Sequence, residues 1–256
     1  MNGNYIEIVG LNYKKIIENI NIAFEKNKII TVSGPNNCGK TTLIRILSKQ
    51  LECQNAIIIN NKKLEDYSII ELNSILKTVI PMEIDFKKDK LKDELLYAVD
   101  KNLLNELLQK FDLNKKINNK ISNMSNKDII IIQIIKSLLS KNSIILIDDL
   151  SEYLNHKEIE KIFENIRYFS NKNKNTIIYF TTDLYTSIYT DYIYVINNKE
   201  IVIEGLPLDV LKNDNVINKN GLDIPFMVDL SVKLKDYDLV SDVILNMEDM
   251  VNTLWK

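Results

Sequence analysis

The sequence predicts an α/β fold with an antiparallel β subdomain, a helical insert and a small C-terminal helical extension. Residues 28–47 pass from a short apolar, β-branched run through a glycine turn into a helical pattern. Residues 144–147 and 177–181 are continuous apolar runs, typical of buried parallel strands, and an aspartate follows each run within two residues. Residues 5–9 and 20–24 alternate apolar and polar side chains, as half-buried antiparallel strands do.

The glycine turn at residues 34–41 matches the P-loop pattern G-x-x-x-x-G-K-[ST] at every fixed position. Gly34 and Gly39 let successive N–H groups point at phosphate, and the dipole of the following helix adds partial positive charge. Lys40 is predicted to reach the β- and γ-phosphates of a bound nucleotide, and the Thr41 hydroxyl to ligate Mg²⁺. A glycine turn without a ligand is the alternative, but the strand before it and the helix after it favour a nucleotide site. The predicted nucleotide-binding residues are Tyr13, Gly34, Pro35, Asn36, Asn37, Cys38, Gly39, Lys40, Thr41 and Thr42.

Length and composition limit the possible functions. At 256 residues the chain accommodates one full α/β core and one small addition. Its net charge of −2 gives no general attraction for nucleic acid or anionic lipid, so we expect no nucleic-acid partner. Cys38 and Cys53 form neither a disulfide framework nor a metal-ligand spacing, which fits a reducing cytoplasm. No signal peptide or membrane-spanning run is expected, so any membrane association must come through a partner.

The early elements are expected to build the antiparallel subdomain. Tyr13 is predicted in a loop between the first two strands, where its ring either stacks on the nucleotide base or is a buried structural tyrosine. After the P-loop helix, the pattern predicts a strand at 57–59, a turn at 60–63, a helix at 68–76 and a strand at 78–80 that Pro81 stops.

Residues 91–139 are predicted to form a helical insert. The leucine-rich positions with helical spacing are Leu95, Leu96, Val99, Leu103, Leu104, Leu107 and Leu108. Residues 114–119 form a polar connector, and Ser125 is expected to cap the next helix, with Asp128 three residues on. Because residues 129–139 are apolar nearly all round, that helix should be deeply packed.

Two acids follow the strand at 144–147. The carboxyl ends of parallel strands form the sheet edge at which ligands bind. Asp148 is therefore the predicted Mg²⁺ partner of Thr41, directly or through water, and Asp149 the candidate that orients or deprotonates the attacking water. The alternative is that both acids merely end the strand. A strand at 177–181 and a hairpin over 192–204 complete the predicted sheet.

The order of these motifs resembles that of an ABC-type ATPase. It runs from Tyr13 and the P-loop through MSNKD at 124–128 and LIDDLSEYLN at 146–155 to YFTTD at 179–183. The tail segments GLDIPFMVDLSVKL at 221–234 and ILNMEDMVNTLW at 244–255 resemble the carboxyl extension of ATPase subunits of energy-coupling-factor (ECF) transporters. The resemblance covers essentially the whole chain.

This resemblance implies an ABC-type ATP-binding domain over residues 1–212, with the insert at about 82–140, and a dimerising helical extension over residues 213–256. Such ATPases pair head to tail with a second ATPase subunit, either a paralogue or a copy of the same chain. They act at the cytoplasmic face of the membrane with a transmembrane scaffold subunit and a substrate-binding membrane subunit, and import vitamins or metal ions. The tail is more similar to the paralogue that ends in L-D-V-P-F.

The chain departs from the family pattern at the catalytic positions. Asp149 replaces a glutamate and is shorter by one methylene, and a misplacement of about 1 Å can cost roughly a hundredfold in rate. Thr182 stands where the family has a histidine near the γ-phosphate, and it carries no positive charge. His156, the only histidine, is expected to be a surface residue at a helix start, so it does not replace the missing group.

The family's signature helix, normally L-S-G-G-Q, is also altered. Ser125 keeps the hydroxyl, whereas Asn126 and Lys127 replace glycines that permit close approach to the partner's nucleotide. Lys127 adds charge toward that phosphate, clashes with it, or is simply solvated. Pro81 stands where the family has a glutamine that contacts Mg²⁺, with Glu83 as the nearest polar substitute.

The sequence therefore predicts an ATP-binding subunit of an ECF-type importer whose own site hydrolyses slowly, as the degenerate half of a heterodimer. The stronger rival is a regulatory or structural nucleotide-binding subunit without chemistry of its own, and a soluble P-loop kinase is the weaker one. The tail residues Met247, Met250, Val251 and Leu254 share one helical stripe, which packs on the chain's own core or docks against the other ATPase.

Overall fold

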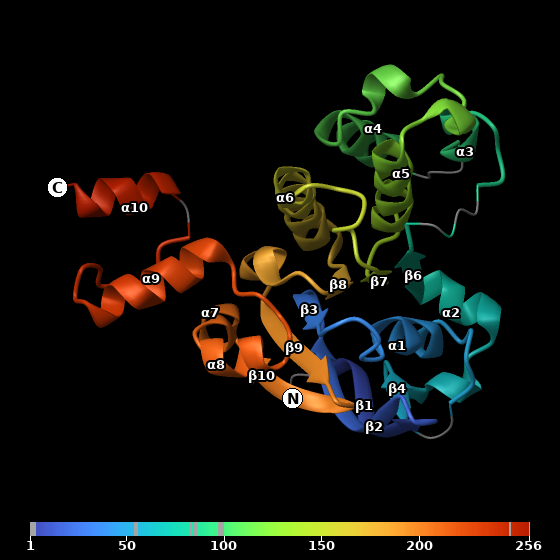
Figure 1. Cartoon of the computed structure of the whole chain (residues 1–256). Coiled ribbons are helices and arrows are strands. Elements are labelled where there is room, and N and C mark those ends of the chain that lie inside the picture. The colour runs from blue at the N-terminus through green and yellow to red at the C-terminus, as the bar shows by residue number, and fades with distance from the viewer. Residues whose placement is uncertain are drawn as a thin grey trace.

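The computed structural model describes residues 4–53, 56–81, 83, 86–96, 100–245 and 247–255. Val99, one of the predicted helical positions of the insert, lies outside them. Two sheets form the centre of the molecule, with the helical insert beyond one end of the larger sheet and the C-terminal helices to its other side (Figure 1). No helix in the described part of the chain is long and apolar enough to cross a membrane.

The larger sheet has six strands in the order β10-β9-β3-β8-β7-β6, and all its pairings are parallel except that of β9 with β10. Every residue of β3, β7 and β8 is buried, which confirms the strands predicted from continuous apolar runs. The strands are β3 Ile29–Ser33, β6 Leu76–Val79, β7 Ile144–Ile147, β8 Thr176–Thr181, β9 Tyr192–Asn197 and β10 Glu200–Gly205.

The register of this sheet brings the ends of its central strands to one edge. Ser33 pairs with Thr181, and Val79 pairs with Ile147. The residues that follow β3, β6, β7 and β8 therefore all emerge at the same edge of the sheet.

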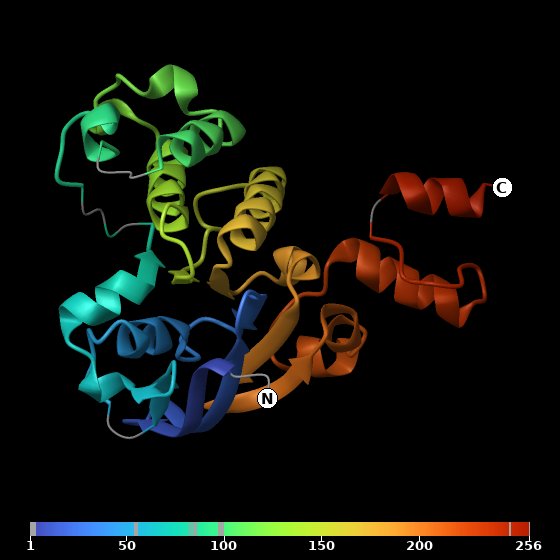
Figure 2. The ribbon, with the colours of Figure 1, turned by 180° about the vertical axis from the view of Figure 1, so that it is seen from behind.

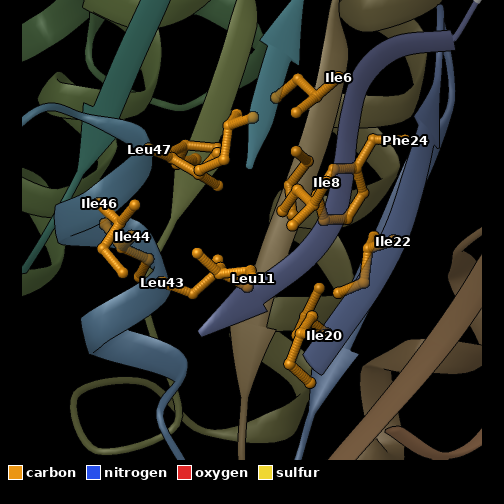
Figure 3. Packing of buried hydrophobic residues seen from close by; sticks show 14 of the residues in the cluster. Ile6, Ile8, Leu11, Ile20, Ile22, Phe24, Leu43, Ile44, Ile46 and Leu47 are labelled. Carbon is orange, nitrogen blue, oxygen red and sulfur yellow. The ribbon is translucent and has the colours of Figure 1, made fainter. Parts of the chain in front are cut away.

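The smaller sheet is antiparallel, in the order β2-β1-β4-β5, and it packs on the P-loop helix α1, Lys40–Leu47. Its strands are β1 Asn4–Tyr13, β2 Ile17–Glu25, β4 Ile57–Ile59 and β5 Lys62–Lys63. Figure 3 shows Ile6, Ile8 and Leu11 of β1 and Phe24 of β2 beside Leu43 and Leu47 of α1, and all of these side chains are at least 99% buried.

The expectation that Tyr13 lies in a loop is wrong. Tyr13 is the last residue of β1 and pairs with Ile17, the first residue of β2. The two strands run on until only residues 14–16 turn between them, with Lys14 at a φ of 50° and the Ile16 N–H donating to the Tyr13 carbonyl at 3.1 Å. The Tyr13 ring is half-buried against the core of the antiparallel sheet.

The helical insert shares one apolar core with α6 and one face of the larger sheet. α5, Asn126–Leu138, is buried along most of its length, as predicted, and packs on β6 and on α6, His156–Asn173. Ser125 caps α5, since its Oγ accepts the Asp128 N–H at 3.2 Å. The other helices before α6 are α2 Ile69–Ile75, α3 Leu91–Glu94 and α4 Lys101–Lys110, with 3₁₀ turns at Leu64–Asp66, Asn114–Lys116 and Ile121–Asn123.

The last two C-terminal helices extend away from the sheet, whereas the two before them pack in one apolar cluster with β9 (Figures 1 and 2). A 3₁₀ helix at Leu184–Tyr189 packs with α7 Pro207–Leu211, which is followed by α8 Asp214–Lys219, α9 Phe226–Asp236 and α10 Met247–Leu254. On the α10 stripe only Met250 is buried, whereas Met247, Val251 and Leu254 are 54%, 44% and 38% exposed. The chain's own core therefore covers one quarter of that stripe.

A buried carboxylate that the sequence did not reveal ties the insert together. Glu94 Oε2 accepts the backbone N–H groups of Lys87 and Lys88, both at 2.9 Å, and Oε1 accepts Lys136 Nζ of α5 at 2.5 Å. The Glu94 side chain is only 2% exposed, so water does not replace these bonds. The segment leading into α3 is thereby fixed to α5.

We predict that Glu94→Ala lowers the free energy of unfolding by about 3 kcal/mol, because it leaves two backbone donors and a lysine without their buried acceptor. Glu94→Gln keeps an oxygen for the two N–H groups and should cost roughly half as much. Denaturant unfolding measures both, and Glu200→Ala, an exposed carboxylate on β10, is the control expected to stay within about 0.5 kcal/mol. Equal losses in the two Glu94 variants would contradict a role for the backbone bonds.

Candidate nucleotide site

A cleft of about 630 Å³ opens at the edge where the central strands end. The predicted residues Asn36, Asn37, Gly39, Lys40, Thr41 and Thr42 line it. Asp148, Asp149 and Thr182 line it from the ends of β7 and β8. The structure thus brings together the P-loop, the predicted metal ligands and the predicted catalytic pair.

The glycines of the P-loop meet a steric requirement of this fold. A Cβ on Gly34 would lie 2.1 Å from the Ile196 carbonyl oxygen and 2.6 Å from Cys38 Sγ, so no side chain fits where the loop crosses β9. Gly39 has a φ of 109° at the N-cap of α1, a conformation that glycine adopts without strain. Pro35 and Cys38 form the loop beneath the cleft and do not line it. A backbone this close-fitting supports a phosphate cradle.

The P-loop lysine is held over its own loop. Lys40 Nζ donates to the Gly34 carbonyl at 2.6 Å and to the Pro35 carbonyl at 3.0 Å, and the residue is only 8% exposed. Phosphate oxygens would replace these carbonyls as acceptors. The Lys40 ammonium is therefore positioned by neutral carbonyls and does not have to leave an ion pair to bind phosphate. Thr41, next in sequence, is exposed at the cleft with its hydroxyl available to a metal ion.

Negative charge exceeds positive charge in this cleft. Its charged lining residues are two cations, Lys40 and Arg45, and four carboxylates, Glu83, Asp148, Asp149 and Glu152. A nucleotide polyphosphate entering such a site requires a divalent cation to offset the repulsion. Within the described residues no group of three or more His, Cys, Asp or Glu side chains is arranged to hold a metal ion alone. The donors therefore fit Mg²⁺ that keeps several waters and takes ligands from phosphate.

The pKa of Asp148 reflects both its burial and the excess of negative charge in the cleft. Burial raises the pKa of its carboxyl group; a hydrogen bond from the Asp149 N–H opposes the rise, and the negative charge of Asp149 adds to it. Lys40 pulls the pKa back down, and Glu152 pushes it up. A bound cation would remove this penalty, which supports Asp148 as a metal ligand.

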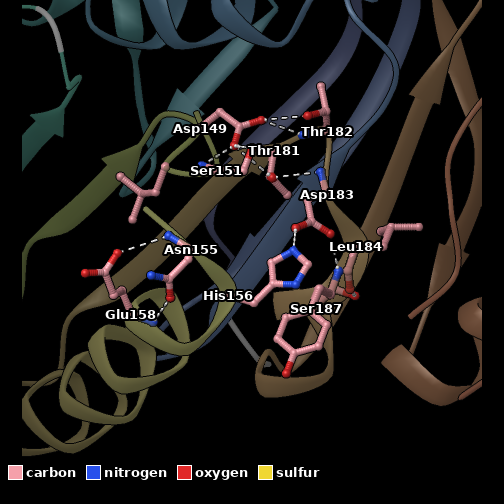
Figure 4. Close-up of polar contacts among 12 residues, drawn as sticks. Asp149, Ser151, Asn155, His156, Glu158, Thr181, Thr182, Asp183, Leu184 and Ser187 are labelled. Atoms are coloured by element: carbon pink, nitrogen blue, oxygen red, sulfur yellow. Dashed lines mark hydrogen bonds and ion pairs between the residues drawn. The ribbon is translucent and has the colours of Figure 1, made fainter. Parts of the chain in front are cut away.

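The carboxylate of Asp149 is fully engaged by its own chain. Oδ1 accepts the N–H and the Oγ of Ser151, at 3.0 and 2.7 Å, and the Oγ1 of Thr181 at 3.2 Å. Oδ2 accepts the N–H and the Oγ1 of Thr182, at 2.7 and 3.0 Å. Figure 4 shows Asp149 between the loops that follow β7 and β8. We call these five hydrogen bonds the Asp149 clamp.

Further contacts connect Thr181, one donor of the Asp149 clamp, to His156 through Asp183. The Asp183 N–H donates to Thr181 Oγ1 at 3.0 Å, and an Asp183 carboxylate oxygen lies 2.7 Å from His156 Nε2 (Figure 4). The imidazole stacks on Tyr185, with ring centroids 4.3 Å apart. His156 is the first residue of α6 and its side chain is 57% exposed, which confirms the predicted surface position at a helix start. The sequence did not foresee its partner Asp183, which is 27 residues away.

The signature residues lie away from the cleft. Ser125 and Lys127 line a separate cavity of about 310 Å³, and Asn126 is the first residue of α5. Lys127 Nζ forms an ion pair with Glu158 of α6 at 2.8 Å, and its side chain is 45% exposed. Whether Lys127 approaches or clashes with a partner's phosphate stays a prediction. Burial of Asp128 opposes its ionisation, but hydrogen bonds from Lys116 and Ser125 hold its pKa below the usual range.

Five further residues line the cleft that sequence reasoning did not assign to it. They are Ile16 from the β1–β2 turn, Arg45, Ile80, Glu152 and Tyr153. Arg45 lies one helical turn after Thr41, so helical spacing was a signal for it. Pro81 and Glu83 also line the cleft, which agrees with Glu83 as the nearest polar substitute for the family's glutamine. Tyr13, predicted to bind nucleotide, is not among the lining residues; base stacking by it stays a prediction.

Comparison with known proteins agrees with this geometry. The pattern of the ABC transporter family matches residues 17–152. The energy-coupling factor transporter ATP-binding protein EcfA1 of Geobacillus kaustophilus is 21% identical over 251 residues, covering 93% of this chain and 90% of that protein. The zinc import ATP-binding protein ZnuC of Ehrlichia ruminantium is 25% identical over 204 residues, covering 80% of this chain and 83% of that protein.

The solved structure of cbiO1 from Clostridium perfringens, part of the ABC transporter complex cbiONQ, matches with a TM-score of 0.73 at 17% sequence identity. The match covers 91% of this chain and 99% of that one. It confirms the predicted fold class.

We predict that Asp148→Asn stabilises the nucleotide-free protein near pH 7, because it removes a negative charge that is costly to bury. Each kcal/mol gained would raise the Tm by about 2–4 °C. Since the folded-state pKa lies above the unfolded value, the wild type loses this stability as the pH rises through that pKa and regains it on acidification, so the difference should shrink at acidic pH.

The same variant should lose most of the rise in Tm that Mg-ATP gives the wild type. Glu200→Gln, which removes an exposed carboxylate from β10, is the charge-matched control. A variant that melts below the wild type without nucleotide, or that keeps the full Mg-ATP effect, would count against Asp148 as the metal ligand.

Proposed function

Because the chain belongs to the ABC transporter family, we propose that it is the ATP-binding subunit of an ECF-type importer. The observation that carries this proposal is the cleft in which the P-loop lysine, Thr41 and Asp148 converge on one sheet edge. The name of one relative, a zinc import ATP-binding protein, supports a metal ion as the imported substrate. A vitamin is the other substrate class that the resemblance to ECF transporters implies. Binding and hydrolysis of Mg-ATP would drive that uptake.

The proposed complex has three kinds of partner: a second ABC-type ATPase, a transmembrane scaffold subunit and a substrate-binding membrane subunit. The relatives' names and the cbiONQ complex of the solved neighbour support such an assembly. The chain would sit peripherally at the cytoplasmic face of the membrane.

Hydrolysis at this subunit's own site is proposed to be slow. Two features support this. First, the carboxylate that would activate water already accepts the hydrogen bonds of the Asp149 clamp. Second, the Thr182 hydroxyl donates to Asp149 within that clamp and is not free to donate to phosphate. Lys40 and Arg45 are then the cations near a developing phosphate charge, with no histidine beside them in the lining of the cleft. The same clamp favours the rival function, a nucleotide-binding subunit that regulates its partner without any chemistry.

The C-terminal extension is proposed to dock against the second ATPase subunit. Besides the α10 stripe, Phe226, Tyr237, Leu239 and Trp255 are 65%, 78%, 56% and 80% exposed. Phe226 begins α9, Tyr237 and Leu239 follow that helix, and Trp255 follows α10. Several large exposed apolar side chains along one extension are typical of an interface between proteins. The proposed extension, residues 213–256, would then hold the ATPase pair together outside the nucleotide sites.

The test of the transport role is steady-state ATPase activity of the complex purified with its native partners, comparing wild type with Lys40→Ala in this chain alone. The variant should no longer bind ATP at this P-loop. Its ATPase turnover should fall at least tenfold, because nucleotide bound here is needed to close the ATPase pair. Thr176→Ser, in a buried strand remote from the cleft, is a control for handling and assembly. Near-normal turnover would favour the rival function.

The docking proposal predicts that truncation after Asp242 weakens assembly of the ATPase pair without abolishing ATP binding. Because truncation also removes the bond from the Ile244 N–H to Ser231 Oγ, the double variant Val251→Ser/Leu254→Ser is the sharper probe: it changes two partly exposed side chains and spares Met250. Sedimentation velocity should show dissociation at concentrations where wild type stays paired. Fully assembled variants would rule out docking through this stripe.

A further inference from the structure

Glu152 is an uncommitted carboxylate in the nucleotide cleft. It lies three residues after Asp149 in the loop that follows β7, and its side chain lines the cleft together with Lys40, Thr41 and Asp148. Among the described residues it has no hydrogen-bond or ion-pair partner, and it is exposed to solvent. Its negative charge is close enough to Asp148 to raise the pKa of that group.

Asp149 is poorly placed to activate water. A carboxylate offers about four lone-pair sites, and the clamp directs five donors at the two oxygens of Asp149. A general base needs a lone pair aimed at the proton that it removes, within about 3 Å. To act as base, Asp149 would have to give up at least one bond from Ser151, Thr181 or Thr182; loss of a threonine bond would weaken the contact between the loops after β7 and β8.

We propose that Glu152, and not Asp149, is the acid that accepts the proton of the attacking water in whatever hydrolysis this subunit's own site performs. The water oxygen forms a bond to the terminal phosphorus while the bond from that phosphorus to the bridging oxygen breaks. The water proton passes to the Glu152 carboxylate and from there to solvent, to which this side chain is open. The leaving nucleoside diphosphate carries away the bridging oxygen's charge, with Lys40 beside it.

In this scheme Asp149 is a positioning residue. Its clamp fixes the start of the loop that carries Glu152, because Ser151 donates both its N–H and its hydroxyl to Asp149 Oδ1. Glu152 follows directly on Ser151. The longer glutamate side chain also has one methylene more than aspartate, which extends its reach from an exposed loop toward the phosphate end of the cleft. The inference rests on the proposed ATPase function and assigns its base.

The experiment uses the complex purified with its partners, with the partner ATPase's catalytic carboxylate changed to its amide, so that both sites still bind nucleotide and turnover reports this chain's site. Glu152→Gln should lower that turnover at least tenfold, with the affinity for a fluorescent ATP analogue unchanged within about twofold. Nucleotide recovered from the variant complex should be ATP alone, whereas the parent complex should also hold ADP. Glu152→Asp, which keeps the charge on a shorter side chain, should retain an intermediate rate, and Glu200→Gln the parental rate.

Asp149→Asn provides the contrast. It should lower the Tm, because the amide nitrogen cannot accept the bonds of the clamp, and should reduce turnover less than Glu152→Gln does. Unchanged turnover in Glu152→Gln, or a larger loss of turnover in Asp149→Asn, would overturn the inference. So would a turnover of the parent complex that is no higher than that of the same complex with Lys40→Ala added. That last result would leave the proposed slow site intact, whereas a parent rate equal to the partner's would refute the slow site and leave the Glu152 comparison standing.

Discussion

The parallel pairing of β3, β8 and β7 fixes where the P-loop, Asp148, Asp149 and Thr182 lie in the nucleotide cleft. Because Ser33 pairs with Thr181, the P-loop and the Thr181–Thr182 loop leave the sheet side by side. Ile147 pairs with Tyr179 on the other side of β8, so Asp148 and Asp149 emerge against the same loop. A shift in the β7–β8 pairing would move Asp149 by a residue's length relative to Thr181 and Thr182 and break the clamp, whereas a shift in the β3–β8 pairing would move the P-loop away from both.

Charge balance at this edge explains why the cleft is suited to a metal–nucleotide complex and poorly suited to either part alone. Four carboxylates oppose two cations, and Lys40 is already satisfied by loop carbonyls. Polyphosphate without metal would meet repulsion from Asp148 and Glu152, whereas a metal without polyphosphate lacks a ligand set among the described residues. In the proposed Mg-ATP complex each component would therefore increase the affinity for the other, which is positive coupling between two ligands of one site.

The fold could be predicted from the sequence largely because its signals are local. The β-branched runs of β3, β7 and β8, the P-loop and the Ser125 cap are each specified within a few residues, and the structure confirms them. The prediction of a loop at Tyr13 is wrong because the pairing of β1 with β2 continues through the segment that is expected to turn. The remaining site features depend on pairs far apart in sequence: Asp149 with Thr182, His156 with Asp183, and Lys127 with Glu158. No periodicity reports such pairs, since they exist only once the sheet has set the loops in contact.

The Asp149 clamp also relates two substitutions that the sequence presents as independent losses. A glutamate at position 149 would place its carboxylate one methylene farther out, beyond the donors of Ser151 and Thr182 that now hold the aspartate. A histidine at position 182 would remove the Oγ1 donor and leave Asp149 Oδ2 with the backbone N–H alone. The two residues therefore fit each other. Asp149 needs the Thr182 hydroxyl as a donor, and that hydroxyl finds its acceptor only when the acid at position 149 has the length of aspartate. Changing one position without the other disrupts the loop that carries Glu152, so these two positions form one structural unit.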